Sequence, residues 1–289
     1  MSAPTARPGK SPWLIGIASH AILVGVSFIA LYPVLWVIRM ALTPSQGFAM
    51  GLSPIPENPS LQNFADVVGK TDLNGTWVFG HQLLNSLVIS GTTALLAVGL
   101  STTAAYAFSR FRFPGQELGM RSLLVTQMFP GTMMMIPLYI LLDLTGLLDT
   151  RTGLVLVYST TAIPFSTWML KGYFDTIPKE LEEAARMDGA GTFQIFFEII
   201  LPLARPAIAI TALFSFMTAW NEFILAAKLM NAETSYTLPV VLQSYVGARS
   251  TAWGHFAAGA ILVSAPVMAL FFVLQKHLVE GLTAGSVKG

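Results

Sequence analysis

Few side chains in this 289-residue chain have the types and spacing that catalysis or metal binding requires. The chain contains no cysteine, which excludes disulfides, zinc–thiolate sites, iron–sulfur clusters and thiol nucleophiles. Its four histidines, His20, His81, His255 and His277, are never three or four residues apart, so their spacing predicts no metal site. No serine–histidine–aspartate set or paired-carboxylate site is evident. We therefore expect no catalytic, cofactor-binding or metal-binding residue here.

A phosphate-binding loop is also excluded. Gly9, Lys10 and Ser11 match the end of such a loop, but the pattern needs a glycine where the chain has Pro4. No strand is expected before this segment. Any nucleotide that drives the protein is therefore expected on another chain.

The composition indicates a membrane protein. Hydrophobic residues make up 54% of the chain and charged residues only 11%, whereas an average soluble domain carries roughly 25% charged residues. The net charge of +1 argues against a nucleic-acid partner. So little polar surface would not cover a soluble body of this size, but a lipid bilayer needs no such cover.

Six apolar segments reach the length of about 20 residues that crosses a bilayer as a helix. Helices are required because lipid offers no partner for open backbone groups. The first segment follows two basic residues, as a secretory signal does, but it is much longer than the roughly 7–15 apolar residues of a signal core. The sequence thus predicts an all-α membrane protein of one domain, residues 1–289, with six transmembrane helices at residues 13–40, 83–108, 118–142, 153–171, 203–227 and 255–278.

The basic residues predict the orientation, since they concentrate on the cytoplasmic side. With the N-terminus inside, 11 of the 16 lysines and arginines lie inside, and the other 5 lie outside, namely Arg39, Lys70, Arg151, Lys228 and Arg249. Both termini are then cytoplasmic. Residues 43–82, with a short helix at 61–68, and residues 229–254 form extracytoplasmic loops. Residues 172–202 form the long cytoplasmic loop.

That cytoplasmic loop has the most informative pattern. Pro178 suits the first position of a helix, where its missing N–H is not needed, and glutamates in the next turns favour the positive end of the helix. Gly189 suits a helix stop. We expect two short helices at an angle, residues 178–188 and residues 193–200, the second ended by Pro202.

The loop resembles the signature of importer-type ABC permeases: Glu-Ala-Ala, three residues, Gly, nine residues, Ile, one residue, Leu-Pro. Every spacing matches at Glu183, Ala184, Ala185, Gly189, Ile199, Leu201 and Pro202. Glu182 stands beside Glu183, and only the spacing selects Glu183.

In that family the first loop helix is a coupling helix that docks in a cleft of an ATPase subunit. The resemblance implies that Glu183 or Arg186 makes polar contacts with the ATPase. Ala184 and Ala185 would allow the close fit, and Gly189 would set the bend. Without the resemblance, the helix would equally be a loop helix resting on its own bundle.

The end of the chain adds to the resemblance. Trp220-Asn221-Glu222-Phe223 is similar to carbohydrate-uptake permeases, and residues 281–289 are similar to the maltose/maltodextrin permease type, the MalG-like subunits. In that type the C-terminal tail reaches between two ATPase subunits. The expected cytoplasmic tail is residues 280–289, with contacts from Gly285, Ser286, Val287, Lys288 and Gly289.

Polar side chains in the spans are the candidates for a transport pathway. Glu222 is the acidic residue nearest to lying inside a span, and beside Asn221 it would either serve the pathway or lie solvated at the interface. Trp220 would either stack on a sugar ring or anchor the aromatic belt. Thr160 and Thr161 would either line a path for a polyhydroxyl solute or bond across helices.

The resemblance covers essentially the whole chain and implies the type I ABC importer permease fold. It also implies partners: a second, MalF-like permease, a pair of MalK-like ATPase subunits that bind ATP and magnesium, an extracytoplasmic sugar-binding protein, and membrane lipid. This chain would bind no cofactor and would not be an enzyme. Its place would be the cytoplasmic (inner) membrane of a bacterium or archaeon.

The cargo suggested by the resemblance is maltose or maltodextrin. The same machine could carry another sugar, such as trehalose, or a glycerol phosphate. A carrier driven by an ion gradient would need acidic relays in the membrane, and the spans hold few acidic residues. A non-transporting scaffold would not need the full loop pattern.

Overall fold

The computed structural model describes residues 12–48, 53–247 and 250–286. Within these ranges the chain is helical apart from turns, irregular loops and two isolated β-bridges, Thr71–Trp77 and Val246–Thr251. The all-α prediction is therefore confirmed. Contacts divide the chain into two compact units, residues 1–67 with 245–261 and residues 68–244 with 262–289.

The first unit contains helix α1 (Pro12–Leu42), most of helix α2 (Gln62–Val68) and the first turns of helix α13 (Trp253–Ser286). Asn63 in α2 is 1% exposed. Its Nδ2 donates to the carbonyl oxygens of Ala41 (3.0 Å) and Thr43 (2.7 Å), and its Oδ1 accepts from Gln46 (2.7 Å). This amide fastens α2 to the end of α1.

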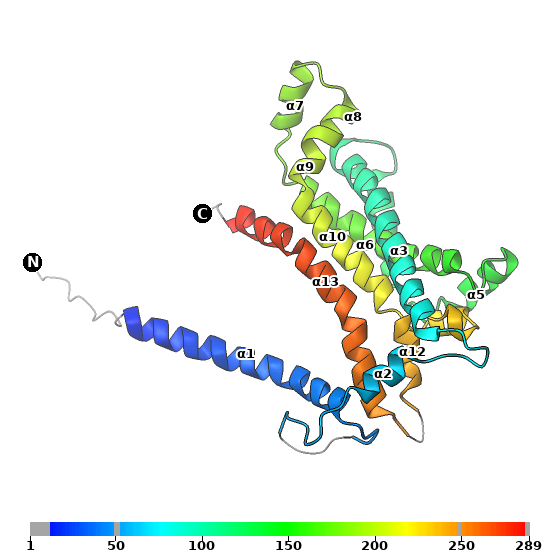
Figure 1. Ribbon diagram of the computed structural model, residues 1–289. Coiled ribbons are helices and arrows are strands. Elements are labelled where there is room, and N and C mark those ends of the chain that lie inside the picture. The colour runs from blue at the N-terminus through cyan, green and yellow to red at the C-terminus, as the bar shows by residue number, and fades with distance from the viewer. Residues whose placement is uncertain (1–11, 49–52, 248–249, 287–289) are drawn as a thin grey trace, which may run out of the picture. The chain divides into compact units, whose positions relative to one another are not determined.

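The second unit has three long helices at its centre, α3 (Val78–Arg110), α6 (Arg151–Phe174) and α10 (Arg205–Trp220), which lie side by side (Figure 1). Small hydroxyl side chains join them. Ser101 of α3 donates to the carbonyl oxygen of Ile163 (3.0 Å), and the hydroxyls of Ser166 in α6 and Ser215 in α10 share a 3.0 Å hydrogen bond. Small polar residues allow such close helix packing in a membrane.

The prediction of one continuous helix over residues 118–142 is wrong. The structure has helix α4 (Gln116–Gln127), then turns, then helix α5 (Met135–Leu144). Pro130 and Gly131 lie in the break, where Pro130 has no N–H for a helical hydrogen bond. The amides of Met133 and Met134 bond to the carbonyls of Pro130 and Gly131 instead (2.9 and 3.1 Å). Hydrophobic length alone does not reveal such a break.

Four of the other five predicted spans are present as helices of sufficient length. The span predicted at residues 203–227 is not one continuous helix, because α10 ends at Trp220. Among the described residues, four helices are long and apolar enough to cross a membrane: Gly16–Leu42, Val78–Arg110, Arg151–Phe174 and Trp253–Lys276. A fifth candidate is the pair Thr192–Leu203 and Arg205–Trp220, which bends by 76° at a short break.

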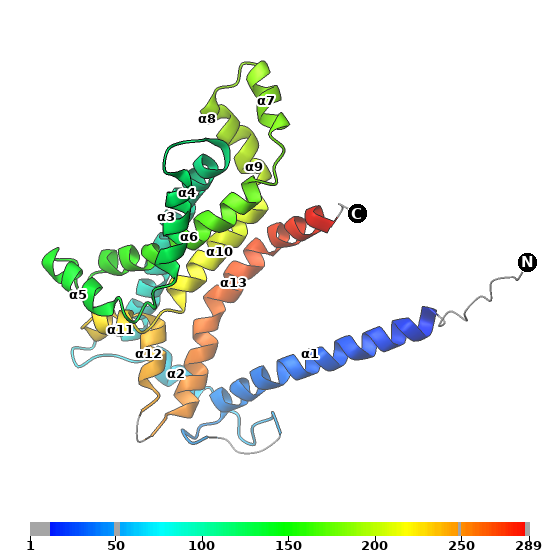
Figure 2. The ribbon, with the colours of Figure 1, turned by 180° about the vertical axis from the view of Figure 1, so that it is seen from behind.

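Short helices occupy the two ends of the second unit. One end carries α7 (Glu180–Met187), α8 (Thr192–Gln194), a π-helical turn η1 (Ile195–Ile200) and α9 (Leu201–Leu203). The other end carries α5, α11 (Ala226–Leu229), the 3₁₀ turn η2 (Glu233–Ser235) and α12 (Leu238–Ser244). Figure 2 shows the two groups well apart, with α3, α6 and α10 between them.

Candidate functional site

The short helix α7 carries the Glu-Ala-Ala sequence and lies at the end of α3. It begins at Glu180, two residues later than predicted. Gly189 ends it with a φ of +87°, in the left-handed region that favours glycine. The amide of Ala190 then bonds to the carbonyl of Ala185 (2.9 Å), as expected for a glycine-terminated helix. The predicted helix stop at Gly189 is confirmed.

A buried ion pair holds α7 against α3. Arg110, the last residue of α3, donates from Nε to Oε1 of Glu182, and 4% of each side chain is exposed. The hydroxyl of Tyr106 donates to Oε2 of the same carboxylate (3.1 Å). A second guanidinium nitrogen of Arg110 donates to the carbonyl of Ile177 (3.0 Å), in the segment that leads into α7. Glu182 therefore uses both carboxylate oxygens within the chain.

Further hydrogen bonds connect the ion pair to the end of α6. Ser109 accepts from Arg110 (2.9 Å) and donates to Asp175 (2.6 Å), and Asp175 also accepts from Lys171 (2.7 Å). Burial alone would raise the pKa of Asp175, but the hydrogen bonds from Lys171 and Ser109 outweigh it and lower the pKa below its ordinary value. One polar network thus joins the ends of α3 and α6 to α7.

An apolar core lies under this network. Its buried members are Ala105, Tyr106, Leu170, Phe174, Ile177, Ile195, Phe196, Ile200, Ala204 and Ala207. The rings of Tyr106 and Phe196 have centroids 4.8 Å apart. Leu201 of the signature packs against this core, and Pro202 lies in α9, just before the 76° bend. The loop 172–202 is therefore a packed extension of the helices.

The opposite face of α7 is open. Glu183 and Ala184 are exposed. Arg186 lies one turn after Glu182 on the same side of the helix and is also exposed, and Ala185 is half-buried. The structure thus separates the two adjacent glutamates, with Glu182 inside and Glu183 outside. Large apolar side chains surround the open face: Leu181 is 44% exposed, Met187 88% and Phe193 82%. Exposed apolar groups gathered on one loop are typical of an interaction surface.

The C-terminal candidates lie partly in the described chain. Gly285 and Ser286 belong to the last turn of α13. Val287, Lys288 and Gly289 lie outside the described residues.

The pathway candidates at the end of α10 are mostly built into the fold. Trp220 is 1% exposed, stacks on Phe216 with centroids 5.3 Å apart, and donates from its indole nitrogen to the carbonyl of Val263 (3.2 Å). Glu222 accepts from the hydroxyl of Tyr158 (2.8 Å) and from the backbone amides that lead into α11 (2.9 and 3.1 Å). Asn221 is exposed. This geometry favours a packing role for Trp220 and a helix-capping role for Glu222.

Thr160 and Thr161 line a cavity of about 390 Å³ beside the break between α4 and α5. Each hydroxyl donates to its own helix, Thr160 to the carbonyl of Val157 (2.7 Å) and Thr161 to that of Tyr158 (2.9 Å). The rest of the lining is mainly apolar and includes Phe129. The two threonines therefore reach a cavity, as a pathway role requires. Their hydroxyl groups, however, already donate hydrogen bonds within α6.

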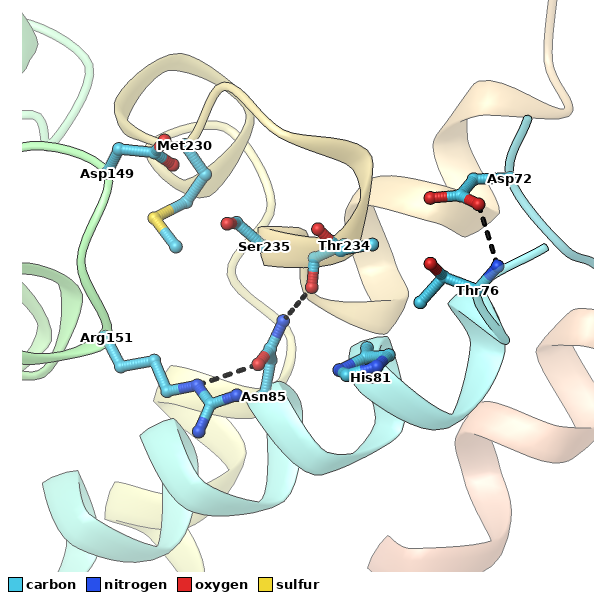
Figure 3. A pocket seen from close by; sticks show the side chains of 9 residues that line it. All are labelled: Asp72, Thr76, His81, Asn85, Asp149, Arg151, Met230, Thr234 and Ser235. Carbon is cyan, nitrogen blue, oxygen red and sulfur yellow. Dashed lines mark hydrogen bonds between the residues drawn. The ribbon is translucent and has the colours of Figure 1, made fainter. Parts of the chain in front are cut away.

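A polar pocket of about 440 Å³ lies at the other end of the second unit (Figure 3). Asn85 of α3, 1% exposed, is at its base. Its Nδ2 donates to the carbonyls of Thr234 (2.8 Å) and Tyr236 (3.1 Å), and its Oδ1 accepts from Nε of Arg151 (2.8 Å). Asp149, with a φ of +58°, accepts from the amide of Asn231 (3.0 Å). These bonds fix the loop around η2 on the starts of α3 and α6.

Sequence reasoning missed Arg110, Tyr106 and Asn85 as structural centres. Arg110 and Glu182 are 72 residues apart, and Asn85 and Thr234 are 149 apart, so no local spacing connects them. The one available signal was that two glutamates are adjacent in α7. Neighbouring residues on a helix point in different directions, so both could not face the same partner. Among the described residues, no three His, Asp or Glu side chains converge to hold a metal ion.

Comparison with known proteins identifies the family. Residues 97–283 match the family described as "Binding-protein-dependent transport system inner membrane component". The maltodextrin permease MdxG of Bacillus subtilis (strain 168) is 36% identical over 302 residues and is covered completely, as is this chain. The galactooligosaccharide permease GanQ of the same organism is 37% identical over 273 residues, which cover 94% of this chain and 95% of GanQ.

A further relative is similar over nearly the whole chain, and one solved structure has a similar fold. The maltose/maltodextrin permease MalG of Vibrio vulnificus (strain YJ016) is 37% identical over 290 residues, with 94% of this chain and 95% of MalG covered. The fold matches a chain of a bacterial ABC transporter that imports the acidic polysaccharide alginate, with a TM-score of 0.74, 24% identity, and coverage of 95% of this chain and 99% of that one. The chain therefore belongs to the family of binding-protein-dependent transport system inner membrane components.

Proposed function

We propose that this chain is a permease subunit of an ABC importer that carries a carbohydrate, most simply maltose or maltodextrin. Separate subunits would bind ATP and magnesium and hydrolyse the ATP. The observation that carries the proposal is α7: a helix fixed to the membrane spans on one side and open, small and apolar on the other. Such a helix suits the transfer of force from a docked partner.

The exposed face of α7 is the proposed docking surface for the ATPase. Ala184 lets the partner approach closely, and Met187 offers an apolar side chain that is 88% exposed. Glu183 and Arg186 would supply polar contacts at its edge. The tail, residues 280–289, would add a second contact. ATP-driven closure would pull on α7 and bias the helix bundle toward one of two states, as coupling requires.

The distribution of basic residues supports the proposed orientation. The loop 172–202 and both termini would lie in the cytoplasm. Residues 43–82 and 229–254 would then lie outside, where a sugar-binding protein would dock. A second permease, MalF-like, would complete the pathway, with Thr160 and Thr161 as candidate lining residues in this half.

The cargo is proposed from the relatives. Two of them are named for maltose or maltodextrin and one for galactooligosaccharides, at nearly equal identity. All are carbohydrates, which supports a sugar cargo more strongly than any single sugar.

Uptake into vesicles tests the proposal. We would rebuild this chain with its partner permease, ATPase and binding protein and measure labelled maltose with and without ATP. We expect uptake that requires ATP, and we expect Met187→Asp to lose both uptake and co-purification of the ATPase. Leu73→Asp, at a fully exposed residue distant from α7, should keep the ATPase bound. Uptake by this chain alone, driven by a proton gradient, would refute the proposal.

A further inference from the structure

The buried glutamate of α7 has a role that differs from that of its exposed neighbour. We propose that Glu182 is a positioning residue: its ion pair with Arg110 fixes the rotation of α7 and makes it one rigid body with the ends of α3 and α6. This inference rests on the proposed function, in which α7 receives the ATPase.

Glu182 itself is not available to a partner. Only 4% of its side chain is exposed, and its two carboxylate oxygens accept from Arg110 and Tyr106. The guanidinium of Arg186, also in α7, lies 3.9 Å from the same carboxylate, so a second positive charge is close to it. A carboxylate enclosed in this way acts on the docking face only through the placement of its helix.

The ion pair determines which residues face outward. An α-helix turns by about 100° per residue, so Ala184 points about 200° away from Glu182. Holding Glu182 against α3 therefore turns Ala184 to the open side, with Met187 about 60° and Glu183 about 100° from it around the helix. This matches their observed exposure.

The contacts of Arg110 give the pair its rigidity. The guanidinium bonds the carboxylate, the carbonyl of Ile177 (3.0 Å) and the hydroxyl of Ser109 (2.9 Å), which in turn bonds Asp175 at the end of α6. A planar guanidinium with several fixed partners allows few alternative geometries. A pull on α7 is thus transmitted to two membrane spans without bending the connecting segment.

The chain contains a matched control. Arg121 and Glu117 form a second arginine–glutamate pair, with 72% and 81% of their side chains exposed. Exposed pairs contribute little, whereas removing one partner of a buried pair leaves an unpaired charge inside. Glu182→Gln and Glu117→Gln make the same chemical change at a buried and at an exposed pair.

The test uses the complete transporter in vesicles and two readouts, hydrogen exchange of the α7 amides and labelled maltose transported per ATP hydrolysed. For Glu182→Gln we expect exchange about ten-fold faster and transport per ATP about ten-fold lower, within the range of typical coupling energies. Glu117→Gln should match the wild type in both. Unchanged exchange in Glu182→Gln would overturn the proposal, even with reduced transport.

A second variant covers the case in which Glu182→Gln fails to fold. Because the chain has no cysteine, Arg110→Cys together with Glu182→Cys creates a single thiol pair that a short bifunctional reagent can link. The linked chain should transport within about two-fold of the wild type, since α7 need not leave α3. Loss of transport on linking would overturn the proposal. Wild-type vesicles without ATP-dependent uptake would instead contradict the proposed function, while hydrogen exchange would still test the ion pair.

Discussion

Replacing Gly189 by alanine should loosen α7 without disturbing any packing. Gly189 has a φ of +87°, and a Cβ placed on it would meet no atom within 4 Å. The only cost is therefore the backbone strain of an L-residue in the left-handed region, about 1–2 kcal/mol. That energy corresponds to a factor of about 5–30 in the population of the opened end of α7.

Hydrogen exchange of the amides in residues 184–190 measures this opening directly. The control is Gly191→Ala, two residues away, where φ is −75°, ψ is 163° and a Cβ would also meet no atom within 4 Å. Alanine adopts that conformation freely, so the change should stay within about 0.5 kcal/mol. Equal effects at both glycines, or none at Gly189, would show that the left-handed turn does not hold the end of α7.

Three further predictions concern other parts of the chain. Gly254→Ala should destabilise the first unit by about 1–3 kcal/mol, because its Cβ would lie 2.7 Å from Nδ2 of the buried Asn63; an unchanged melting temperature would contradict this. Glu222→Ala should lower the free energy of unfolding by about 1–2 kcal/mol, because the start of α11 loses its cap, whereas Asn221→Ala should lower it by less than about 0.5 kcal/mol. If uptake falls more in Asn221→Ala than in Glu222→Ala, a pathway role for Asn221 is supported instead. The stabilising contribution of Asp175, whose pKa is lowered by its hydrogen bonds, should be complete above about pH 4 and lost as the pH falls below that value. The melting temperatures of the wild type and of Asp175→Asn should therefore become equal in acid. A difference that stays constant down to about pH 2 would contradict this prediction.

Local chemistry explains what the sequence predicted well. Long apolar segments must be helical in a membrane, and most of them are helices here. Gly189 ends α7 because the residue after a helix often needs a positive φ, and glycine adopts it most easily. The short helix expected at residues 61–68 is α2. Each of these features depends on residues close together in the chain.

Features that depend on distant residues were not predictable. The break between α4 and α5 depends on packing as well as on Pro130, since Pro33, Pro164 and Pro266 lie inside continuous helices. The choice between two adjacent glutamates depends on Arg110, 72 residues earlier. Spacing selected Glu183 as the signature residue, and only the structure separates its exposed side chain from the buried one.

The pairing of Glu182 with Arg110 also limits how the chain can be recombined. A loop that folded only on itself could be moved between related permeases as a cassette. Residues 172–202 do not meet that condition, because their buried carboxylate is neutralised by a residue of another segment. If the loop alone were transferred into a related permease that lacks the arginine, the chimera would bury an uncompensated charge. The end of α3 must therefore be transferred together with the loop.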